Sequence, residues 1–311
     1  MALYLVTGGA GFIGSHLVRG LLDRGDRVRV LDDFSSGKRE NLEGLGEGLE
    51  VLEGDLRDLE GVKGAATGCK GVFHLGARPS VVQSVEDPLT CWDVNLMGTV
   101  HVIEAARKEG AKVVFAGSSS AYGDVPGVPK KEDAPLKPLS PYAAAKVAGE
   151  FALKAAAEVH GLEAVILRFF NVFGPRQVPD SPYSGVIAKF TGLLLAGETP
   201  VIDGDGTQSR DFTYVANVVD GCLRAMDRKI PSGEVINLAC GDRITVLELF
   251  RTLRDALGAD VEPRFGPPRP GDVPHSQADI TKAEELLGFR PIVSFREGIE
   301  KTLAWYKENR P

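Results

Sequence analysis

Two residues four positions apart, Tyr142 and Lys146, are the pair in this chain most suited to proton transfer. Residues at this spacing project from one face of a helix, and Ser140-Pro141 is a typical helix start. A phenol acts as a base near neutral pH only when its pKa is lowered, which a neighbouring ammonium favours. Together with Ser118, the pair could take a proton from a substrate hydroxyl while hydride leaves the carbinol carbon. The alternative is a surface helix with an exposed tyrosine and lysine.

A glycine-rich run has the spacing of a dinucleotide-binding turn. Gly8, Gly11 and Gly14 allow a tight turn, close approach of a pyrophosphate, and contact between the first strand and the next helix. Asp32 lies 18 residues beyond Gly14, where a carboxylate accepts hydrogen bonds from an adenosine ribose and repels a 2′-phosphate. The run therefore predicts an NAD site. Asp55 and Leu56 follow the third expected strand, where they could bind the edge of the adenine base. Asp55 could equally cap the next turn.

The order of elements predicts how these residues are positioned. The first 170 residues alternate apolar runs with helical patterns, which is typical of βαβ units and a parallel sheet. Strands are expected at 3–7, 27–31, 49–52, 71–75, 112–116 and 163–169, and helices at 13–24, at 99–109 and from Ser140 to Gly161. The prediction is an α/β fold, a Rossmann-type doubly wound parallel sheet. Ligands bind beyond the carboxyl ends of strands in such sheets, which is where Ser118 is expected.

After about residue 170 the pattern changes. Glycine and proline become frequent and the regular βα alternation is lost. We expect residues 1–170 to form the NAD-binding Rossmann domain and residues 171–311 to form a smaller α/β lobe that binds the substrate. Residues 211–238 are expected to pack back on the Rossmann domain.

Composition excludes several other classes of protein. The 311 residues are 43% hydrophobic and 25% charged, as in ordinary globular proteins. The net charge of −7 gives no basic surface for nucleic acid. No apolar stretch approaches the length of a membrane span, and the first residues predict a buried strand and not a signal peptide. Four scattered cysteines suggest neither a disulfide framework nor a metal site, so the cytoplasm is the expected compartment.

Several motifs in order resemble the extended short-chain dehydrogenase/reductase family. They are the glycine turn at 8–14, Asp32, the run His74-Leu75-Gly76-Ala77, Asn95, Ser118 and Tyr142-x-x-x-Lys146. The runs at 168–175, 206–215 and 269–272 are similar to the nucleotide-sugar branch of that family, and to its 4-epimerases in particular. The resemblance covers nearly the whole chain. It implies that the second lobe binds a nucleotide sugar.

The resemblance also implies a role for each matching residue. Tyr142 is the expected base, Lys146 lowers its pKa and binds the nicotinamide ribose, and Ser118 assists. Arg210 and Arg269 are expected on the diphosphate, because arginine forks suit phosphate. A local ion pair with Asp211 is the alternative for Arg210. The expected cofactor contacts are Gly8, Gly11, Phe12, Ile13, Gly14, Asp32, Asp55, Leu56, Leu75, Ala77, Asn95, Tyr142 and Lys146, and the expected substrate contacts are Ser118, Asn171, Arg210, Arg269, Asp272 (on the uridine ribose) and Ser276.

The tripeptide Ser118-Ser119-Ser120 distinguishes among the reactions of this branch. Related dehydratases and decarboxylases resemble Thr-Asp-Glu or Ser/Thr-Ser/Asp-Glu there, whereas this chain has no carboxylate to assist loss of water. We therefore expect C4 epimerisation of a UDP-hexose through a 4-keto sugar, with NAD regenerated in each cycle. The small Ser276 predicts that N-acetylhexosamine forms are also accepted.

Two other functions remain open at this stage. One is a nucleotide-sugar 4-reductase or dehydrogenase with net redox change, which would need an exchangeable cofactor. The other is a dinucleotide-binding sensor without catalysis, against which the joint presence of Ser118, Tyr142 and Lys146 argues. The family resemblance further implies a homodimer formed through a helix pair.

Overall fold

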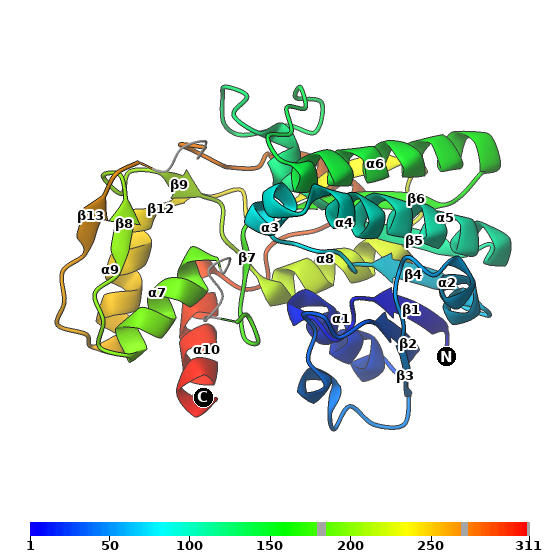
Figure 1. Cartoon of the computed structure of the whole chain (residues 1–311), viewed down its shortest axis with the longest axis horizontal. Helices are drawn as coiled ribbons and strands as arrows, with labels where there is room; N and C mark the ends of the chain where they lie inside the picture. The colour runs from blue at the N-terminus through cyan, green and yellow to red at the C-terminus, as the bar shows by residue number, and fades with distance from the viewer. Residues whose placement is uncertain (179–184, 269–272, 310–311) are drawn as a thin grey trace.

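A seven-stranded sheet forms the centre of the larger lobe in the computed structural model, which describes residues 1–178, 185–268 and 273–309 (Figure 1). Its strands are β1 (Leu3–Thr7), β2 (Arg27–Asp32), β3 (Leu49–Glu53), β4 (Gly71–His74), β5 (Lys112–Ser118), β6 (Ala164–Phe169) and β11 (Glu234–Leu238). The strand order is β11-β6-β5-β4-β1-β2-β3, and every neighbouring pair is parallel. The chain winds outward in both directions from β1 and β4, so the doubly wound Rossmann-type fold expected from the sequence is confirmed.

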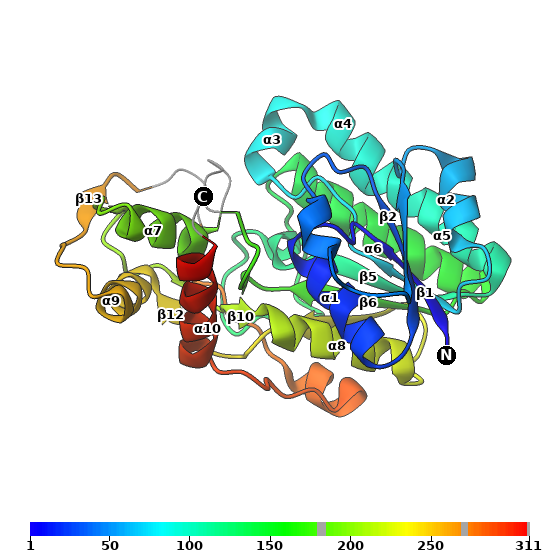
Figure 2. The same cartoon turned by 90° about the horizontal axis from the view of Figure 1, so that it is seen from below.

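Helices cover both faces of this sheet (Figure 2). They are α1 (Phe12–Asp23), α2 (Leu59–Ala66), α5 (Gly98–Glu109), α6 (Pro141–His160) and α8 (Val215–Asp227), while the short helices α3 (Val81–Glu86) and α4 (Pro88–Trp92) pack on α6. Successive strand residues point to opposite faces: Val6 packs in the core with α1 and α8, and Leu5 packs in the core with α2 and α5. Because both faces are buried, the strands are apolar without polar alternation.

The remaining elements form a smaller lobe beside the carboxyl ends of the strands (Figure 1). They are β7 (Val172–Phe173), β8 (Val201–Asp203), β9 (Ser209–Arg210), β10 (Thr213–Tyr214), β12 (Ile244–Thr245), β13 (Arg264–Gly266), α7 (Val186–Leu195), α9 (Val246–Leu257) and α10 (Phe295–Glu308). The strands pair two by two, as β7 with β10, β9 with β12 and β8 with β13. This lobe has its own apolar core around Phe173, Ile202 and Phe250. The proposed boundary at residue 170 stays a prediction.

The six strands expected from the sequence are all present, with ends within two residues of those expected. The long helix α6 begins after Ser140, whose side chain accepts the N–H of Ala143, and ends before Gly161 at φ +67°. The seventh strand, β11, was not expected as a strand. Its five residues follow a turn at Gly233, and they pair with β6, about 70 residues earlier in the chain, and pack against α8.

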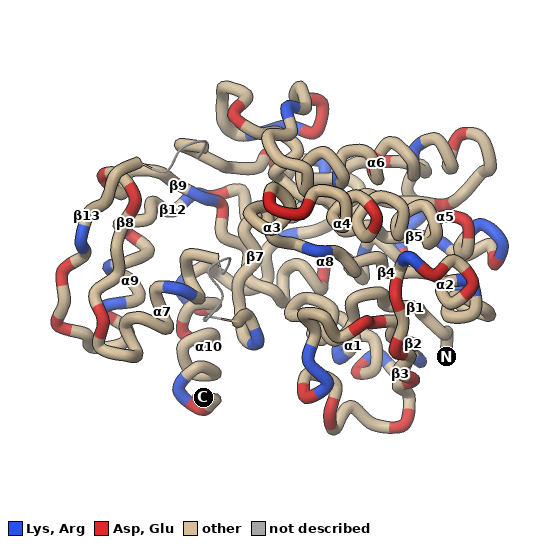
Figure 3. The backbone as a smooth tube through the Cα atoms, in the orientation of Figure 1, with Lys and Arg blue, Asp and Glu red and all other residues tan. Residues whose placement is uncertain are grey.

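Charged residues of both signs are interspersed over the two lobes (Figure 3). Among the described residues, no helix is both long and apolar enough to cross a membrane.

A buried ion pair joins α6 to the sheet. Arg168 of β6 donates from Nε to Glu150 Oε1 (3.0 Å) and from Nη2 to Glu150 Oε2 (2.7 Å), and both side chains are only 2% exposed. The third guanidinium nitrogen donates to the carbonyl of Glu132 at 3.2 Å, and the group lies 4.7 Å from the Tyr122 ring centroid. The bidentate geometry and the additional contacts fix the position of α6 along the sheet.

Removing one partner of this pair should be costly. In Glu150→Gln the charge of Arg168 stays buried without its counter-ion, so we expect the free energy of unfolding, measured by urea titration, to fall by about 3–5 kcal/mol. The double variant Glu150→Leu with Arg168→Met removes both charges, and we expect its free energy of unfolding to fall by less than that of Glu150→Gln. A Glu150→Gln protein within about 1 kcal/mol of the wild type would contradict this prediction.

Candidate active site

A cleft of about 740 Å³ lies at the carboxyl ends of the central strands, and residues of both lobes line it. The structure brings most of the sequence-predicted site residues together here: Gly8, Gly11, Phe12, Ile13, Gly14, Asp32, Asp55, Leu56, Leu75, Ala77, Ser118, Tyr142, Lys146 and Asn171. Asn95, Arg210 and Ser276 are described but lie outside this lining. Arg269 and Asp272 fall outside the described residues.

The turn between β1 and α1 is tightly packed and requires glycine. Gly8 has φ +68°, and a Cβ there would come within 2.8 Å of the Gly76 backbone. A Cβ on Gly14 would come within 2.1 Å of the Gly8 carbonyl oxygen. The first turn of α1 has neither a side-chain cap nor an acidic residue, so its free N–H groups and the helix dipole favour an anion.

Asp32 connects this turn to the end of β2. Its carboxylate accepts the N–H groups of Ala10 and Phe34, each at 2.9 Å, and burial raises its pKa. The two bonds leave further lone pairs on each oxygen for a ribose diol. Asp55, on the same side of the cleft, accepts from the backbone and the side chain of Arg57, and this bonding lowers the pKa of Asp55. Asp55 thus caps the turn that follows it, and Asp58 caps α2.

The three residues expected to act in catalysis come from two adjacent elements. Ser118 ends β5, and Tyr142 and Lys146 lie on consecutive turns of α6. Burial raises the pKa of Tyr142, and the nearby Ser118 side chain acts in the opposite direction. Ser118 Oγ bonds Ser120 Oγ at 2.8 Å. The hydroxyl groups of Ser118 and Tyr142 and the ammonium of Lys146 therefore lie together at the cleft.

Lys146 is held deep in the cleft wall. Its side chain is 2% exposed, and its ammonium donates to the Ala116 carbonyl at 2.9 Å and lies 4.8 Å from the Phe115 ring centroid. Burial lowers the pKa of Lys146 to about 8, while Glu150 one turn later acts in the opposite direction. The ammonium thus remains mostly charged at neutral pH, with a single defined backbone partner.

A buried polar chain supports the cleft floor through His74. Thr99 Oγ1 donates to the Asn95 carbonyl at 2.6 Å, so it accepts from His74 Nε2 at 3.0 Å. His74 Nδ1 then accepts from Thr7 Oγ1 at 2.7 Å. Thr7 Oγ1 in turn accepts the N–H of Gly76 at 3.1 Å. This order of donors requires a neutral histidine with its proton on Nε2.

Asn95 lies behind the cleft and supports its lining. Its side chain is buried and bonds both backbone groups of Arg78, accepting from the N–H at 2.7 Å and donating to the carbonyl at 3.1 Å. The segment that it holds includes Ala77 and Arg78, which line the cleft. The structure therefore places Asn95 where it can act on a bound cofactor only through this segment.

The expected substrate residues are spread over two regions. Asn171 lines the main cleft. Arg210 lies in the second lobe and donates to the carbonyls of Ser209 and Pro274, at 2.9 and 3.3 Å. Asp211 does not pair with it, because its buried carboxylate accepts three backbone N–H groups, from Cys240, Gly241 and Ala278. Ser276 donates its backbone N–H to Ser209 beside Arg210.

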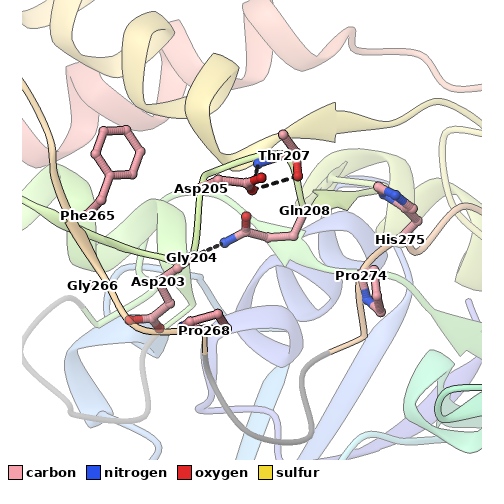
Figure 4. Close-up of a pocket in the computed structure, with 10 residues that line it drawn as sticks. All are labelled: Asp203, Gly204, Asp205, Thr207, Gln208, Phe265, Gly266, Pro268, Pro274 and His275. Carbon is pink, nitrogen blue, oxygen red and sulfur yellow. Dashed lines mark hydrogen bonds between the residues drawn. The ribbon is translucent and has the colours of Figure 1, made fainter.

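A second hollow of about 700 Å³ lies next to Arg210 in the smaller lobe. Figure 4 shows Asp203, Gln208 and His275 around it, with the Phe265 ring at its edge. Gln208 donates to the Asp203 carbonyl at 2.6 Å, and the Asp205 side chain is tied to Thr207. Among the described residues, no group of His, Cys, Asp or Glu side chains is arranged to hold a metal ion.

Sequence reasoning missed several residues of the main cleft. Lys38, Asn41, Gln83, Arg176 and Gln177 all line it. Arg176 directly follows the motif at 168–175 that resembles the nucleotide-sugar branch. Its residue type and its spacing from other residues do not by themselves indicate a place in the cleft. Its positive φ angle and its position facing α1 are visible only in three dimensions.

Comparison with known proteins gives a consistent result. Residues 4–239 match the model of the NAD dependent epimerase/dehydratase family. A UDP-glucose 4-epimerase of Mycolicibacterium smegmatis is 43% identical over 97% of this chain and 98% of its own length. The structure is similar to a UDP-N-acetylglucosamine 4-epimerase from Methanobrevibacter ruminantium in complex with UDP-N-acetylmuramic acid (TM-score 0.95, 40% identity, 99% and 98% coverage). It is also similar to a Thermus thermophilus UDP-glucose 4-epimerase in complex with NAD (TM-score 0.89, 38% identity, 98% and 99% coverage).

Acid should destabilise this protein through its buried histidines. Burial, and then the charge of Lys146, lower the pKa of His74 to about 3, and burial lowers the pKa of His16 to about 4. In the unfolded chain these histidines bind protons at about pH 6.5. The free energy of unfolding is therefore highest above this pH and falls as the pH drops towards the folded pKa values. We expect each histidine to contribute a slope of about 1.4 kcal/mol per pH unit between those limits, measured by urea unfolding.

The variants His74→Asn and His16→Asn separate the two contributions. Each should remove one of the slopes and leave the other. An unchanged pH dependence in His74→Asn would show that the imidazole does not enter the folded state neutral.

Proposed function

Because this chain belongs to the NAD-dependent epimerase/dehydratase family, we propose that it interconverts UDP-hexoses by inverting the hydroxyl group at C4. The reaction passes through a 4-keto sugar, and the cofactor is NAD. The observation that carries this proposal is the cluster of Ser118, Tyr142 and Lys146 in a cleft whose serine tripeptide has no carboxylate. Because the serine tripeptide offers no carboxylate to assist loss of water, redox at C4 proceeds without elimination.

The residues of the cleft fit the cofactor. Gly8 and Gly14 let the turn pack closely on the protein's own backbone, and the uncapped N–H groups of α1 at this turn suit a pyrophosphate. Asp32 stands at the end of β2 to accept from the adenosine ribose and to disfavour a 2′-phosphate. NAD bound here supplies the hydride acceptor and donor, and in its oxidised form a positive charge.

Tyr142 acts as the base in this mechanism. Its phenolate oxygen takes the proton of the sugar 4-hydroxyl and becomes the phenol, and the nearby Ser118 hydroxyl binds the same sugar oxygen. Burial raises the pKa of Tyr142, so the phenolate needs added positive charge. Lys146 provides part of that charge and, held on the Ala116 carbonyl, is positioned to bind a ribose hydroxyl. When the keto group is reduced on its other face, Tyr142 returns the proton.

Epimerisation requires a nucleotide that is held firmly while the sugar turns. Arg210 and the hollow beside it in the second lobe support this anchoring role, and Asn171 lies between that lobe and Tyr142 at the cleft. Arg269 and Asp272, which complete the proposed nucleotide contacts, fall outside the described residues. The small Ser276 supports acceptance of N-acetylhexosamine forms as well.

The proposed activity can be tested by proton NMR of the anomeric region. We expect purified protein mixed with UDP-galactose, without added NAD or NADH, to form UDP-glucose up to a fixed ratio, because the cofactor is regenerated within each cycle. UDP-N-acetylgalactosamine is the second substrate to test. An unchanged spectrum, even with NAD supplied, would rule out this assignment, and turnover only with added NADH would favour a reductase.

Tyr142→Phe provides the matched control for this experiment. The variant keeps the ring and loses only the hydroxyl, so it should retain bound NAD while the rate falls by at least about 100-fold. Full activity in this variant would exclude Tyr142 as the base.

We also propose that the protein is a homodimer. Val85, Leu89 and Phe151 are 64%, 77% and 58% exposed, and they lie on α3, α4 and α6, which contact one another. Apolar residues gathered on adjacent helices are typical of a self-complementary interface.

Sedimentation velocity tests the proposed dimer. We expect the wild-type protein to have twice the 33.2 kDa chain mass and Leu89→Lys to be a monomer, while the control Val201→Lys in the second lobe remains dimeric. A monomeric wild type would contradict the proposal.

A further inference from the structure

Arg176 has an unusual backbone conformation. It lies just after β7, where the chain enters the second lobe, and its φ angle is +69°. Non-glycine residues rarely adopt this left-handed region, and glycine would occupy it without strain. Backbone strain of this kind persists where the surrounding structure holds a side chain in a required position. The conformation therefore raises the question of what the Arg176 side chain does.

One nitrogen of the Arg176 guanidinium is buried at the cleft without a partner, although the residue as a whole is half-buried. This Nη1 atom is inaccessible to solvent and has no hydrogen bond, and no ion pair or hydrogen bond of this side chain occurs in the part of the chain that the structure describes. Burial, and then the charge of Arg19, lower the pKa of Arg176. A partly buried cation without a counter-ion is unfavourable, so this position is suited to an anionic ligand.

Arg176 lies beside the amino-terminal half of α1. The preceding carbonyl, of Pro175, accepts a hydrogen bond from His16 Nε2 at 3.0 Å, and Arg176 lines the same cleft as Gly11, Phe12 and Ile13. His16 is neutral near pH 7 because burial lowers its pKa to about 4. The free N–H groups of α1 and the Arg176 guanidinium thus come to one place from different lobes.

We propose that Arg176 retains the cofactor by pairing its guanidinium with the diphosphate of NAD, opposite the free N–H groups of α1. This inference rests on the proposed function in one respect: an epimerase must return the hydride to the same sugar, so its NAD has to stay bound through the cycle. The contact also joins the second lobe to the cofactor. Arginine suits this position because its fork binds two phosphate oxygens at once.

The test measures cofactor binding and needs no turnover. We expect Arg176→Gln to raise the dissociation constant of NAD at least about tenfold, and to lose NAD on gel filtration, while its dissociation constant for UDP stays within about twofold of wild type. Arg176→Lys should recover part of the NAD affinity. Arg19→Gln is the matched control, because it removes a neighbouring charge that is exposed and does not line the cleft.

Arg176→Gly distinguishes a binding role from a structural one. Glycine relieves the positive φ, so the NAD-free variant should unfold at the same temperature as wild type or higher, while its NAD affinity falls as in Arg176→Gln. Wild-type NAD affinity in both variants would overturn the proposal. So would a loss of UDP affinity in place of NAD affinity, which would assign Arg176 to the diphosphate of the nucleotide sugar.

The outcome is separable from that of the activity test. A protein that does not turn over UDP-galactose, but whose NAD affinity depends on Arg176, would overturn the proposed reaction and leave this inference intact.

Discussion

The docking of α6 on the sheet is the constraint on which the active site depends. Tyr142, Lys146 and Glu150 follow one another at intervals of four residues along this helix, so fixing any one of them fixes the others. Glu150 is fixed by its bidentate pair with Arg168, and Lys146 by the Ala116 carbonyl. The same carboxylate partly offsets the effect of burial on the pKa of Lys146. One buried charge pair thus holds the helix that carries the residues proposed for catalysis and helps to keep Lys146 charged.

A second set of buried polar groups supports the cofactor side of the cleft. The chain from Gly76 through Thr7, His74 and Thr99 to Asn95 ties β1 and β4 to the start of α5. Each hydroxyl both donates and accepts, so the chain has one consistent direction and no unpaired proton. A buried polar network stabilises the fold only when every donor and acceptor in it is paired. This network is complete, so it holds the floor of the cleft rigid.

The sequence predicted the parts of this structure that depend on local spacing. Glycines at 8, 11 and 14 and the Tyr142–Lys146 pair were found because a turn and a helix impose fixed intervals, and both lie at the cleft. The strand β11 and the position of Arg176 depend on contacts between distant segments, which spacing does not encode. Asn95 bonds the backbone of Arg78 in the cleft wall, and its contact with the cofactor stays a prediction. The cytoplasmic location stays a prediction.

The path of the chain between the lobes has a consequence for how such a protein can diversify. After β10 the chain returns to the sheet as α8 and β11, goes back to the second lobe for β12 and α9, packs a short helical turn at Ala283–Leu287 against α8 and β11, and ends in the second lobe with α10. The second lobe is therefore not one continuous stretch of sequence. A single recombination event cannot exchange it as a module, so new specificity has to arise by substitutions within its loops while the folding core is inherited whole.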